Sequence, residues 1–396
     1  MGKNILKLAF LAIISLFAFS CKKEPIAPTG ITLTLTNLSL DVGETDTIKA
    51  IIVPSNASHS ISWSSSNTCI ATISPIGIVT AISNGSTTIT ATTANGDKKA
   101  TCTVNVTKWT SYNTTNGLPD NQINSICFDA HGNKWFGTGK GLTKFDGANW
   151  TTYSRANGFP SNYISTIAND PQGNLWVCTW EAGLLKFDGV NWASYNITNS
   201  GIADNYLYTI TFDTKGNKWI GTYRNGISKF DGVNWTTYNV LNSGLKVSEI
   251  MSIVIDAKGN KWVGTNGAGV YRFDDTNWTN YLGQTDVATI AIDSKDNIWL
   301  ADGLGVYNFD GINWTEYNRY NSGLPSTNVW PIVIDAYDNI WIGVFGEGIS
   351  KFDGTKWTIY NTSNSRLPSN NISAIAIDAQ GNKWFGTEVG ISEFQD

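Results

Sequence analysis

The sequence predicts an all-β protein of two parts, a β-sandwich followed by a seven-bladed β-propeller with four-stranded blades. Three observations support this prediction. Aromatic residues make up 12% of the 396 residues and there are 38 glycines, whereas only 15% are charged, which favours strands joined by tight turns. Residues 30–107 contain short runs that alternate apolar and polar side chains. From Trp109 onward, an aromatic pattern repeats about every 42 residues.

The composition also excludes several functional classes. The formal net charge of -5 arises from 27 basic and 32 acidic residues, and the sequence contains no block of five like charges, so we expect no nucleic-acid binding. The two histidines, His59 and His131, are too few for the usual metal clusters or for a serine protease-like catalytic site. We therefore predict no catalytic residue, no metal site and no cofactor.

The N-terminal segment, residues 1–20, is predicted to be a signal peptide. Lys3 and Lys7 precede an apolar stretch, 8–19, that is too short to span a bilayer as a helix. The following cysteine, Cys21, completes a motif that resembles the lipobox of bacterial lipoproteins. The resemblance implies acylation of Cys21, a membrane anchor, and display on the outer membrane at the cell surface, with residues 21–29 as a tether. The alternative is an ordinary secretory signal followed by an unrelated cysteine.

The first folded unit is expected at residues 30–107. Alternating runs at 31–40, 47–53, 78–82, 87–92 and 101–106, separated by Gly- and Asn-bearing turns, are typical of a sandwich. The string Trp-Ser-Ser-Ser-Asn at 63–67, followed by Gly-Ile-Val at 77–79, resembles the bacterial Ig-like group 2 (BIG2) module. Such modules commonly serve as spacers or adhesive segments. A disulfide between Cys69 and Cys102 remains open at this point, because the sequence does not give the distance between them.

The propeller prediction rests on two series of tryptophans. One follows Gly-Asn-Lys or a variant, and the other stands in Asn-Trp-Thr-x-Tyr or a variant, with seven members each. In the first complete repeat we expect an inner strand at 121–129, a second at 134–138, a third at 141–146 and an outer strand at 149–153.

The two ends of the repeat region predict how the ring closes. The region 108–396 begins with an outer-type strand, 108–112, and finishes with inner, second and third strands. Pairing 108–112 with the last strand would complete a seventh blade and remove two free edges.

Most repeated residues have a structural explanation. The Asp-x-x-Gly-Asn segments, such as 129–133, are predicted to be turns rather than calcium loops, since each supplies one carboxylate. The Phe-Asp-Gly segments indicate hairpins. We expect the tryptophan pairs to pack between blades rather than to form a sugar-binding ladder.

The repeats at 117–123 (Gly-Leu-Pro-x-Asn-x-Ile) and 135–138 resemble the two-component regulator propeller repeat. This family supplies extracytoplasmic sensor propellers to hybrid histidine kinases, often responding to polysaccharide fragments. No kinase or coiled-coil segment is visible in the sequence, so the resemblance does not imply direct signalling. The repeats also look distantly like the streptogramin lyase propellers, which need a catalytic histidine and a metal. His131 is the only histidine of the predicted propeller and lies in a turn, which argues against lyase activity.

Function is expected where the repeats disagree, on the face formed by the outer-to-inner and second-to-third loops around the channel mouth. There, large aromatic or charged residues replace small ones in blades two, three and six. The inner-strand position held by Asn124, Ser165 and Ser373 also becomes large in other blades. The candidate ligand-binding residues are Trp180, Glu181, Tyr208, Tyr223, Arg224, Trp330, Phe345 and Glu347. The alternative is that the large aromatic residues fill gaps between blades.

The leading functional hypothesis is a non-catalytic, monomeric surface protein that binds a glycan or a surface protein with the propeller, while the Ig-like unit acts as a spacer. One alternative is a polysaccharide hydrolase or lyase that uses Glu181 with Glu347 or Asp302. Another is a protein-protein interaction scaffold.

Overall fold

The computed structural model describes residues 26–57, 60–94 and 97–396. The chain divides into two compact units, Met1–Val106 and Thr107–Asp396. The predicted signal peptide, Cys21 and residues 22–25 of the tether lie outside the described residues, as does His59. Within the described ranges, no helix has both the length and the apolar character needed to cross a membrane.

The first unit is an Ig-like arrangement of short antiparallel strands. Its strands are β1 (Gly30–Leu33), β2 (Asn37–Asp41), β3 (Thr45–Thr47), β4 (Ala50–Val53), β5 (Ile61–Ser65), β6 (Ala71–Ile73), β7 (Ile78–Ala81), β8 (Gly85–Thr93) and β9 (Lys99–Tyr112). One sheet contains β5, β8 and β9, and β2 pairs with β9 in it. A second sheet has the order β3, β7, β6, and β1 pairs with β4. Every second residue of β8 from Thr87 to Thr93 is buried, because successive side chains of a strand point to opposite faces.

The cysteine pair left open by the sequence is not bonded. Cys69 and Cys102 are both free thiols. Cys102 is fully buried in the core on β9, beside Val104 and Ile89, whereas Cys69 is exposed in the turn between β5 and β6. The structure thus shows both thiols free, one in the core and one in an exposed turn, for the pair that the sequence left open.

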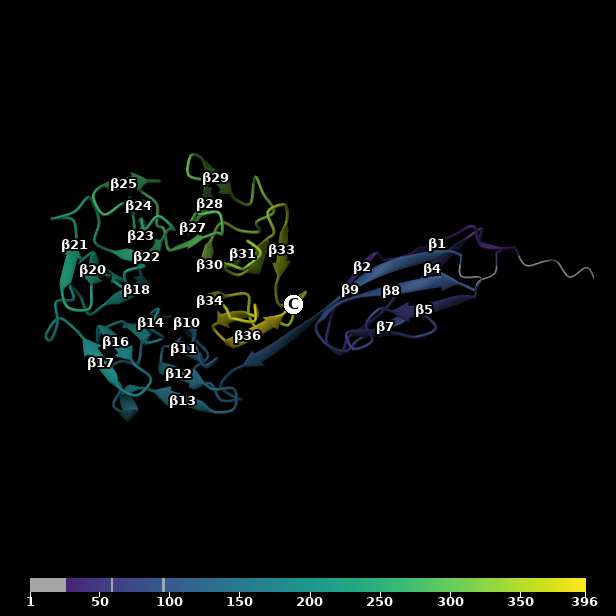
Figure 1. Ribbon diagram of the computed structural model, residues 1–396, viewed down its shortest axis with the longest axis horizontal. Helices are drawn as coiled ribbons and strands as arrows, with labels where there is room; N and C mark the ends of the chain where they lie inside the picture. The colour runs from purple at the N-terminus through teal and green to yellow at the C-terminus, as the bar shows by residue number, and fades with distance from the viewer. Residues whose placement is uncertain (1–25, 58–59, 95–96) are drawn as a thin grey trace, which may run out of the picture. The chain divides into compact units, whose positions relative to one another are not determined.

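The second unit is a ring of four-stranded antiparallel sheets (Figure 1). Blades 1 to 3 consist of β10 (Ile123–Phe128), β11 (Lys134–Thr138), β12 (Gly141–Phe145), β13 (Trp150–Tyr153); β14 (Ile164–Asn169), β15 (Leu175–Thr179), β16 (Leu184–Phe187), β17 (Trp192–Tyr195); and β18 (Leu207–Phe212), β19 (Lys218–Thr222), β20 (Ile227–Phe230), β21 (Trp235–Tyr238). The blade 1 strands confirm the four strands expected in the first repeat to within two residues at each end.

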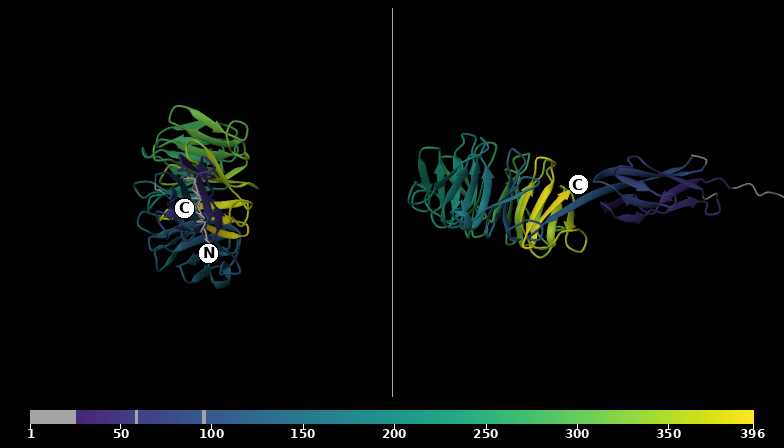
Figure 2. Two further views of the ribbon diagram at one scale, coloured as in Figure 1. Left: turned by 90° about the vertical axis from the view of Figure 1, so that its right-hand side faces the viewer. Right: turned by 90° about the horizontal axis from the view of Figure 1, so that it is seen from below.

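Blades 4 to 6 follow the same order, from the inner strand to the outer one. They consist of β22 (Ile250–Ile255), β23 (Lys261–Thr265), β24 (Val270–Phe273), β25 (Trp278–Tyr281); β26 (Thr289–Ile292), β27 (Ile298–Asp302), β28 (Gly305–Phe309), β29 (Trp314–Tyr317); and β30 (Val329–Ile334), β31 (Ile340–Val344), β32 (Gly348–Phe352), β33 (Trp357–Tyr360). Figure 2 shows the blades from two further directions.

Blade 7 closes the ring from both ends of the propeller sequence, as predicted. Its inner three strands are β34 (Ile372–Ile377), β35 (Lys383–Thr387) and β36 (Gly390–Gln395). The second half of β9 supplies the outer strand and pairs with β36 from Tyr112 opposite Ile391 to Lys108 opposite Gln395. Contacts between neighbouring inner strands run around the whole circle and return from β34 to β10. Across 108–396, where every residue is described, the seven predicted blades are confirmed.

The Asp-x-x-Gly-Asn segments are turns whose aspartate anchors the second-strand tryptophan. In blade 1, Asp129 Oδ1 accepts hydrogen bonds from the backbone N–H groups of His131 and Asn133, and Oδ2 accepts one from Trp135 Nε1 at 2.9 Å. The same Trp–Asp bond recurs in all seven blades at 2.9–3.1 Å. Each of these carboxylates therefore stabilises its turn and orients a core tryptophan.

The tryptophans of both series pack within and between blades. Trp135 is 1% exposed, stacks on Tyr153 of its own blade at a centroid distance of 6.0 Å, and meets Phe187 of blade 2 edge-on at 5.9 Å. The outer-strand Trp235 stacks on Phe230 at 4.4 Å. A Cβ at Gly201 would lie 2.7 Å from Trp235 Cβ, which explains the glycine there. The repeated tryptophans are thus the core between blades, as expected.

Candidate functional site

A β-bulge near the start of the inner strands builds the channel lining. In six blades the register of the inner strand shifts just after its first residue. An extra residue in one strand re-aims side chains locally. The residues at these shifts all line one cavity, and they are Asn124, Ser165, Tyr208, Met251, Trp330 and Ser373. The fold sets the position of the bulge but leaves its side chain free to differ.

The second-to-third loops meet the segments that precede the inner strands. The backbone N–H of Trp180 donates to the carbonyl of Tyr163 at 3.2 Å, and that of Phe345 donates to the carbonyl of Asn328 at 2.9 Å. Both loop sets therefore lie at the same end of the blades, which we call the mouth face.

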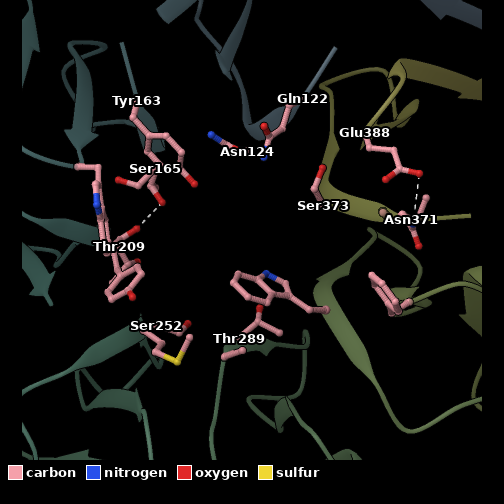
Figure 3. Close-up of a pocket in the computed structure, with 18 of the residues that line it drawn as sticks. Gln122, Asn124, Tyr163, Ser165, Thr209, Ser252, Thr289, Asn371, Ser373 and Glu388 are labelled. Atoms are coloured by element: carbon pink, nitrogen blue, oxygen red, sulfur yellow. Dashed lines mark hydrogen bonds between the residues drawn. The ribbon is translucent and has the colours of Figure 1, made fainter. Parts of the chain in front are cut away.

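The cavity at the mouth has a volume of about 1100 Å³. Figure 3 shows polar side chains around an open centre, with Gln122 and Asn124 at the top, Tyr163 to their left, Asn371 and Glu388 to their right, and Ser252 and Thr289 opposite. The lining combines aromatic faces with amides, hydroxyls and one carboxylate. This is the usual chemistry of a pocket for a polar organic ligand.

Aromatic rings from blades 2 and 3 form the first aromatic wall. The Trp180 ring centroid lies 5.3 Å from that of Tyr208, 5.2 Å from that of Tyr223 and 5.6 Å from that of Tyr206. Trp180 is only half-buried and lines the cavity together with Tyr208. Tyr208 donates its hydroxyl to Glu249 Oε1 at 3.0 Å, and burial together with this carboxylate raises the pKa of Tyr208. These contacts hold the rings in fixed orientations.

The second aromatic wall comes from blade 6. Trp330 is 52% exposed and Phe345 is 64% exposed, and both line the cavity. Both side chains present apolar surface to the cavity. Trp330 is therefore not a buried gap-filler, whereas Trp180 is partly packed against its neighbours.

A polar wall from blades 7 and 1 joins the two aromatic walls. Glu388 Oε1 accepts hydrogen bonds from Ser369 Oγ at 3.1 Å and from Asn371 Nδ2 at 3.0 Å. Asn124 Nδ2 donates to the carbonyl of Ile164 in blade 2 at 3.0 Å. These bonds orient the amides and the carboxylate before a ligand arrives.

The structure brings together four of the eight candidate residues as cavity lining, namely Trp180, Tyr208, Trp330 and Phe345. The other four, Glu181, Tyr223, Arg224 and Glu347, lie on the mouth face outside the cavity lining.

Three of these four have other partners. Glu181 forms an ion pair at 2.7 Å with Arg155, which opens the short 3-10 helix η1 (Arg155–Asn157). The Arg224 guanidinium lies over the ring of Tyr206 at 5.0 Å and over that of Tyr223 at 5.2 Å. Arg224 thus packs on two rings of the first aromatic wall, and Glu181 is held by Arg155.

Sequence reasoning missed the residue that directly precedes a buried aliphatic residue, which stands at the start of each inner strand or, in blade 5, two residues before the strand. These residues differ from blade to blade and are Gln122, Tyr163, Tyr206, Glu249, Asp286, Asn328 and Asn371. Most of them line a cavity. Aligning the repeats on the buried aliphatic residue, such as Ile123 or Ile164, would have revealed this variable series.

A smaller cavity of about 290 Å³ adjoins the large one, and Met251 and Trp330 line both. It also contains two carboxylates, the exposed Asp286 and the buried Asp302. Among the residues that the structure describes, neither cavity is lined by Lys, Arg or His. No group of three or more His, Cys, Asp or Glu side chains in the described ranges is arranged to hold a metal ion.

Asp302 ends β27 at a position where five sister blades carry a buried threonine. Each threonine hydroxyl donates at 2.7–2.9 Å to the carbonyl of the glycine at the start of the third strand. Asp302 is 2% exposed, and its Oδ1 accepts from the backbone N–H groups of Leu304 at 2.7 Å and Gly305 at 3.0 Å. Its Oδ2 accepts no hydrogen bond from any described residue.

The electrostatic surroundings of Asp302 disfavour its charged form. Burial raises the pKa of Asp302, the two backbone hydrogen bonds act in the opposite direction, and the nearby carboxylates of Glu316 and Asp286 raise it further.

Comparisons with known proteins agree with this architecture. The family model described as bacterial Ig-like domain (group 2) matches residues 27–104, and the one described as two component regulator propeller matches residues 117–140, 158–181 and 366–389. An uncharacterized protein of Clostridium acetobutylicum is 38% identical over 92 residues, which are 23% of this chain and 10% of that protein. The chain thus spans about a tenth of that relative.

Solved structures share the propeller fold at low identity. The extracellular domain of a proposed hybrid two component system from B. thetaiotaomicron matches with a TM-score of 0.65 and 23% identity over 72% of this chain and 41% of that one. Virginiamycin B lyase from Staphylococcus aureus matches with a TM-score of 0.61 and 16% identity, over 73% of this chain and 99% of that one. PorZ, a surface component of the type-IX secretion system of Porphyromonas gingivalis, matches with a TM-score of 0.56 and 20% identity, over 79% of this chain and 51% of that one. Residues 27–104 are thus similar to a group 2 bacterial Ig-like domain, and three segments of the propeller are similar to two component regulator propeller repeats.

Proposed function

We propose that this protein is an exported surface lipoprotein whose propeller binds a carbohydrate at its mouth without catalysis, with the Ig-like domain as a spacer. The cavity of about 1100 Å³ carries the proposal, because exposed aromatic faces stand on two sides of it and oriented polar groups on a third. Aromatic faces stack on the apolar faces of sugar rings, while amides and carboxylates bind their hydroxyls.

Anchoring at Cys21 of an outer membrane is proposed from the sequence, in which an apolar segment ends at that cysteine. Two similar solved structures are an extracellular domain and a bacterial surface component, which supports an exported location. The fold also occurs in a lyase. Our proposal of a non-catalytic protein relies on the lining. Of the three carboxylates named in the hydrolase or lyase alternative only Asp302 belongs to it, whereas Glu181 and Glu347 lie outside and Glu181 is paired with Arg155.

A glycan array on the chain lacking residues 1–21, combined with product analysis, tests the proposal. We expect retention of a glycan, no cleavage product, and loss of the signal in Trp330→Ala. Tyr337→Ala is a matched control, because Tyr337 is 86% exposed but lies in the turn between β30 and β31, at the other end of the blade. Cleavage of a bound glycan would favour the hydrolase or lyase alternative, and no Trp330-dependent signal would favour a protein-protein scaffold.

A further inference from the structure

The small cavity beside Asp302 has a charge that the aromatic site does not explain. Asp286 and Asp302 line this cavity, and Glu388 lines the large one. With no Lys, Arg or His among the described residues that line either, the combined space holds three carboxylates and no balancing cation. Low-dielectric walls of one sign of charge concentrate oppositely charged ligands.

Asp302 is not required by the fold. Blades 1 and 7 have the same loop length after the second strand as blade 5, and both have threonine at this position, Thr138 and Thr387. Those hydroxyls are fully buried and bonded, whereas Asp302 keeps one oxygen without a donor. Such a group destabilises the folded state unless a donor arrives from elsewhere. Groups of this kind concentrate at functional sites.

We propose that the small cavity is a subsite for an ammonium group, carried by an amino sugar of a glycan whose other rings occupy the large cavity. This inference rests on the proposed function. The charge of the ammonium group balances those of Asp286 and Asp302, which both line the small cavity. Asp302 Oδ2 is itself buried, and it accepts a hydrogen bond from the ammonium group once the side chain turns toward the cavity.

Two features make this subsite continuous with the glycan site. Trp330 lines both cavities, and the face of an exposed indole attracts a cation as well as a sugar ring. The small cavity, at about 290 Å³, exceeds the share of about 30 Å³ that one water molecule takes in the liquid, so it has room for part of a sugar.

Titrations with three oligosaccharides of equal length test the proposal on the chain lacking residues 1–21. The probes are a glucosamine oligomer with free amines, its fully N-acetylated form, and an oligogalacturonate, at about pH 6, where amines of this type are largely protonated. We expect the free-amine oligomer to bind about tenfold tighter than the N-acetylated one, the acidic oligomer to bind most weakly, and the preference to fall as salt is added.

Two variants identify the carboxylates. Asp302→Thr restores the sister residue and should keep the fold, and Asp286→Asn alters an exposed side chain; each should reduce the preference for the free-amine oligomer about tenfold while leaving the N-acetylated affinity within about twofold. Glu347→Gln, which removes the same charge from a mouth-face residue outside both cavities, should leave the preference unchanged.

Several results would overturn the subsite. One is that the free-amine oligomer does not bind. Another is that the N-acetylated or the acidic oligomer binds as tightly as the free-amine oligomer, or more tightly. A third is that both aspartate variants keep the wild-type preference for the free-amine oligomer. The glycan-binding function is judged separately, because it fails only if the array gives no signal that depends on Trp330.

Discussion

Replacing Asp302 by threonine is expected to stabilise the propeller. At Thr138 and Thr387, in loops of the same length, the hydroxyl donates to a glycine carbonyl at 2.8–2.9 Å and accepts from the backbone N–H two residues later at 3.1 Å. Threonine at 302 can make both bonds, so it replaces one of the two backbone bonds of Asp302 and removes the unpartnered oxygen. A buried unsatisfied polar group costs about 1–3 kcal/mol, and we expect a gain of that size in the free energy of unfolding at neutral pH.

The gain should depend on pH in a defined direction. Because burial raises the pKa of Asp302 in the folded state, the stability contributed by its protonated form is fully present below the unfolded value of about 3.9 and is lost as pH rises through the folded value. The difference between variant and wild type should therefore be smallest at about pH 4, increase as the pH rises, and level off once Asp302 is ionised.

Urea denaturation followed by tryptophan fluorescence measures this difference, because every tryptophan except Trp63 lies in the propeller. The chain without residues 1–21 is compared with its Asp302→Thr variant at a series of pH values, without ligand. An unchanged or lower midpoint for the variant at neutral pH, or a difference that does not vary with pH, would refute the reasoning about the buried carboxylate.

Three further predictions concern the anchor, the ring and the aromatic walls. Cys21→Ala should release the protein into soluble fractions or leave an uncleaved precursor on a fractionation gel; normal processing with unchanged membrane retention would contradict the lipoprotein interpretation. Deleting 108–113 removes the strand partner of β36 and should cause aggregation or a large fall in melting temperature by light scattering and calorimetry, whereas a stable monomer would contradict closure by β9. Trp330→Ala should cost less than about 1 kcal/mol and Trp180→Ala about 2 kcal/mol in denaturation, since a fully buried tryptophan costs about 3–5 kcal/mol; equal large losses would place both in the core.

The ring could be predicted because its structural residues are repeated. Each second-strand tryptophan needs its aspartate acceptor and its stacking partners, so Trp135 and Asp129 reappear with the same spacing in every blade. Closure of the ring could also be predicted. The propeller sequence begins with an outer-type strand that has no blade of its own, and it ends with a blade that lacks its outer strand.

The site was only partly predictable, because its geometry depends on features that the apolar pattern does not record. A bulge shifts the register by one residue without changing the buried aliphatic positions. The variable size at Tyr208 and Ser165 marked this position as part of the site, but nothing in the pattern showed that the residues just before the strands, such as Tyr163, also line the cavity. Charge alone also misled the selection of Glu181, because its ion pair with Arg155 joins residues of different loops. Asp302 was considered only as a catalytic carboxylate, since its unpartnered oxygen is visible only in three dimensions.

The residues that line the mouth differ from one side to the other, because they come from different blades. Aromatic residues in blades 2 and 3 and in blade 6 are separated on one side by blades 4 and 5, which hold the acidic cavity, and on the other by blades 7 and 1, which hold the polar wall. A ligand stacked between Trp180 and Trp330 therefore has one edge toward Asp302 and the other toward Glu388, whose Oε1 is already occupied by Asn371 and Ser369. The side at Asp302 carries two carboxylates, whereas the side at Glu388 carries one that already accepts two hydrogen bonds. A glycan with an ammonium group on one edge therefore matches the Asp302 side better, and this asymmetry favours one orientation of the glycan over its reverse.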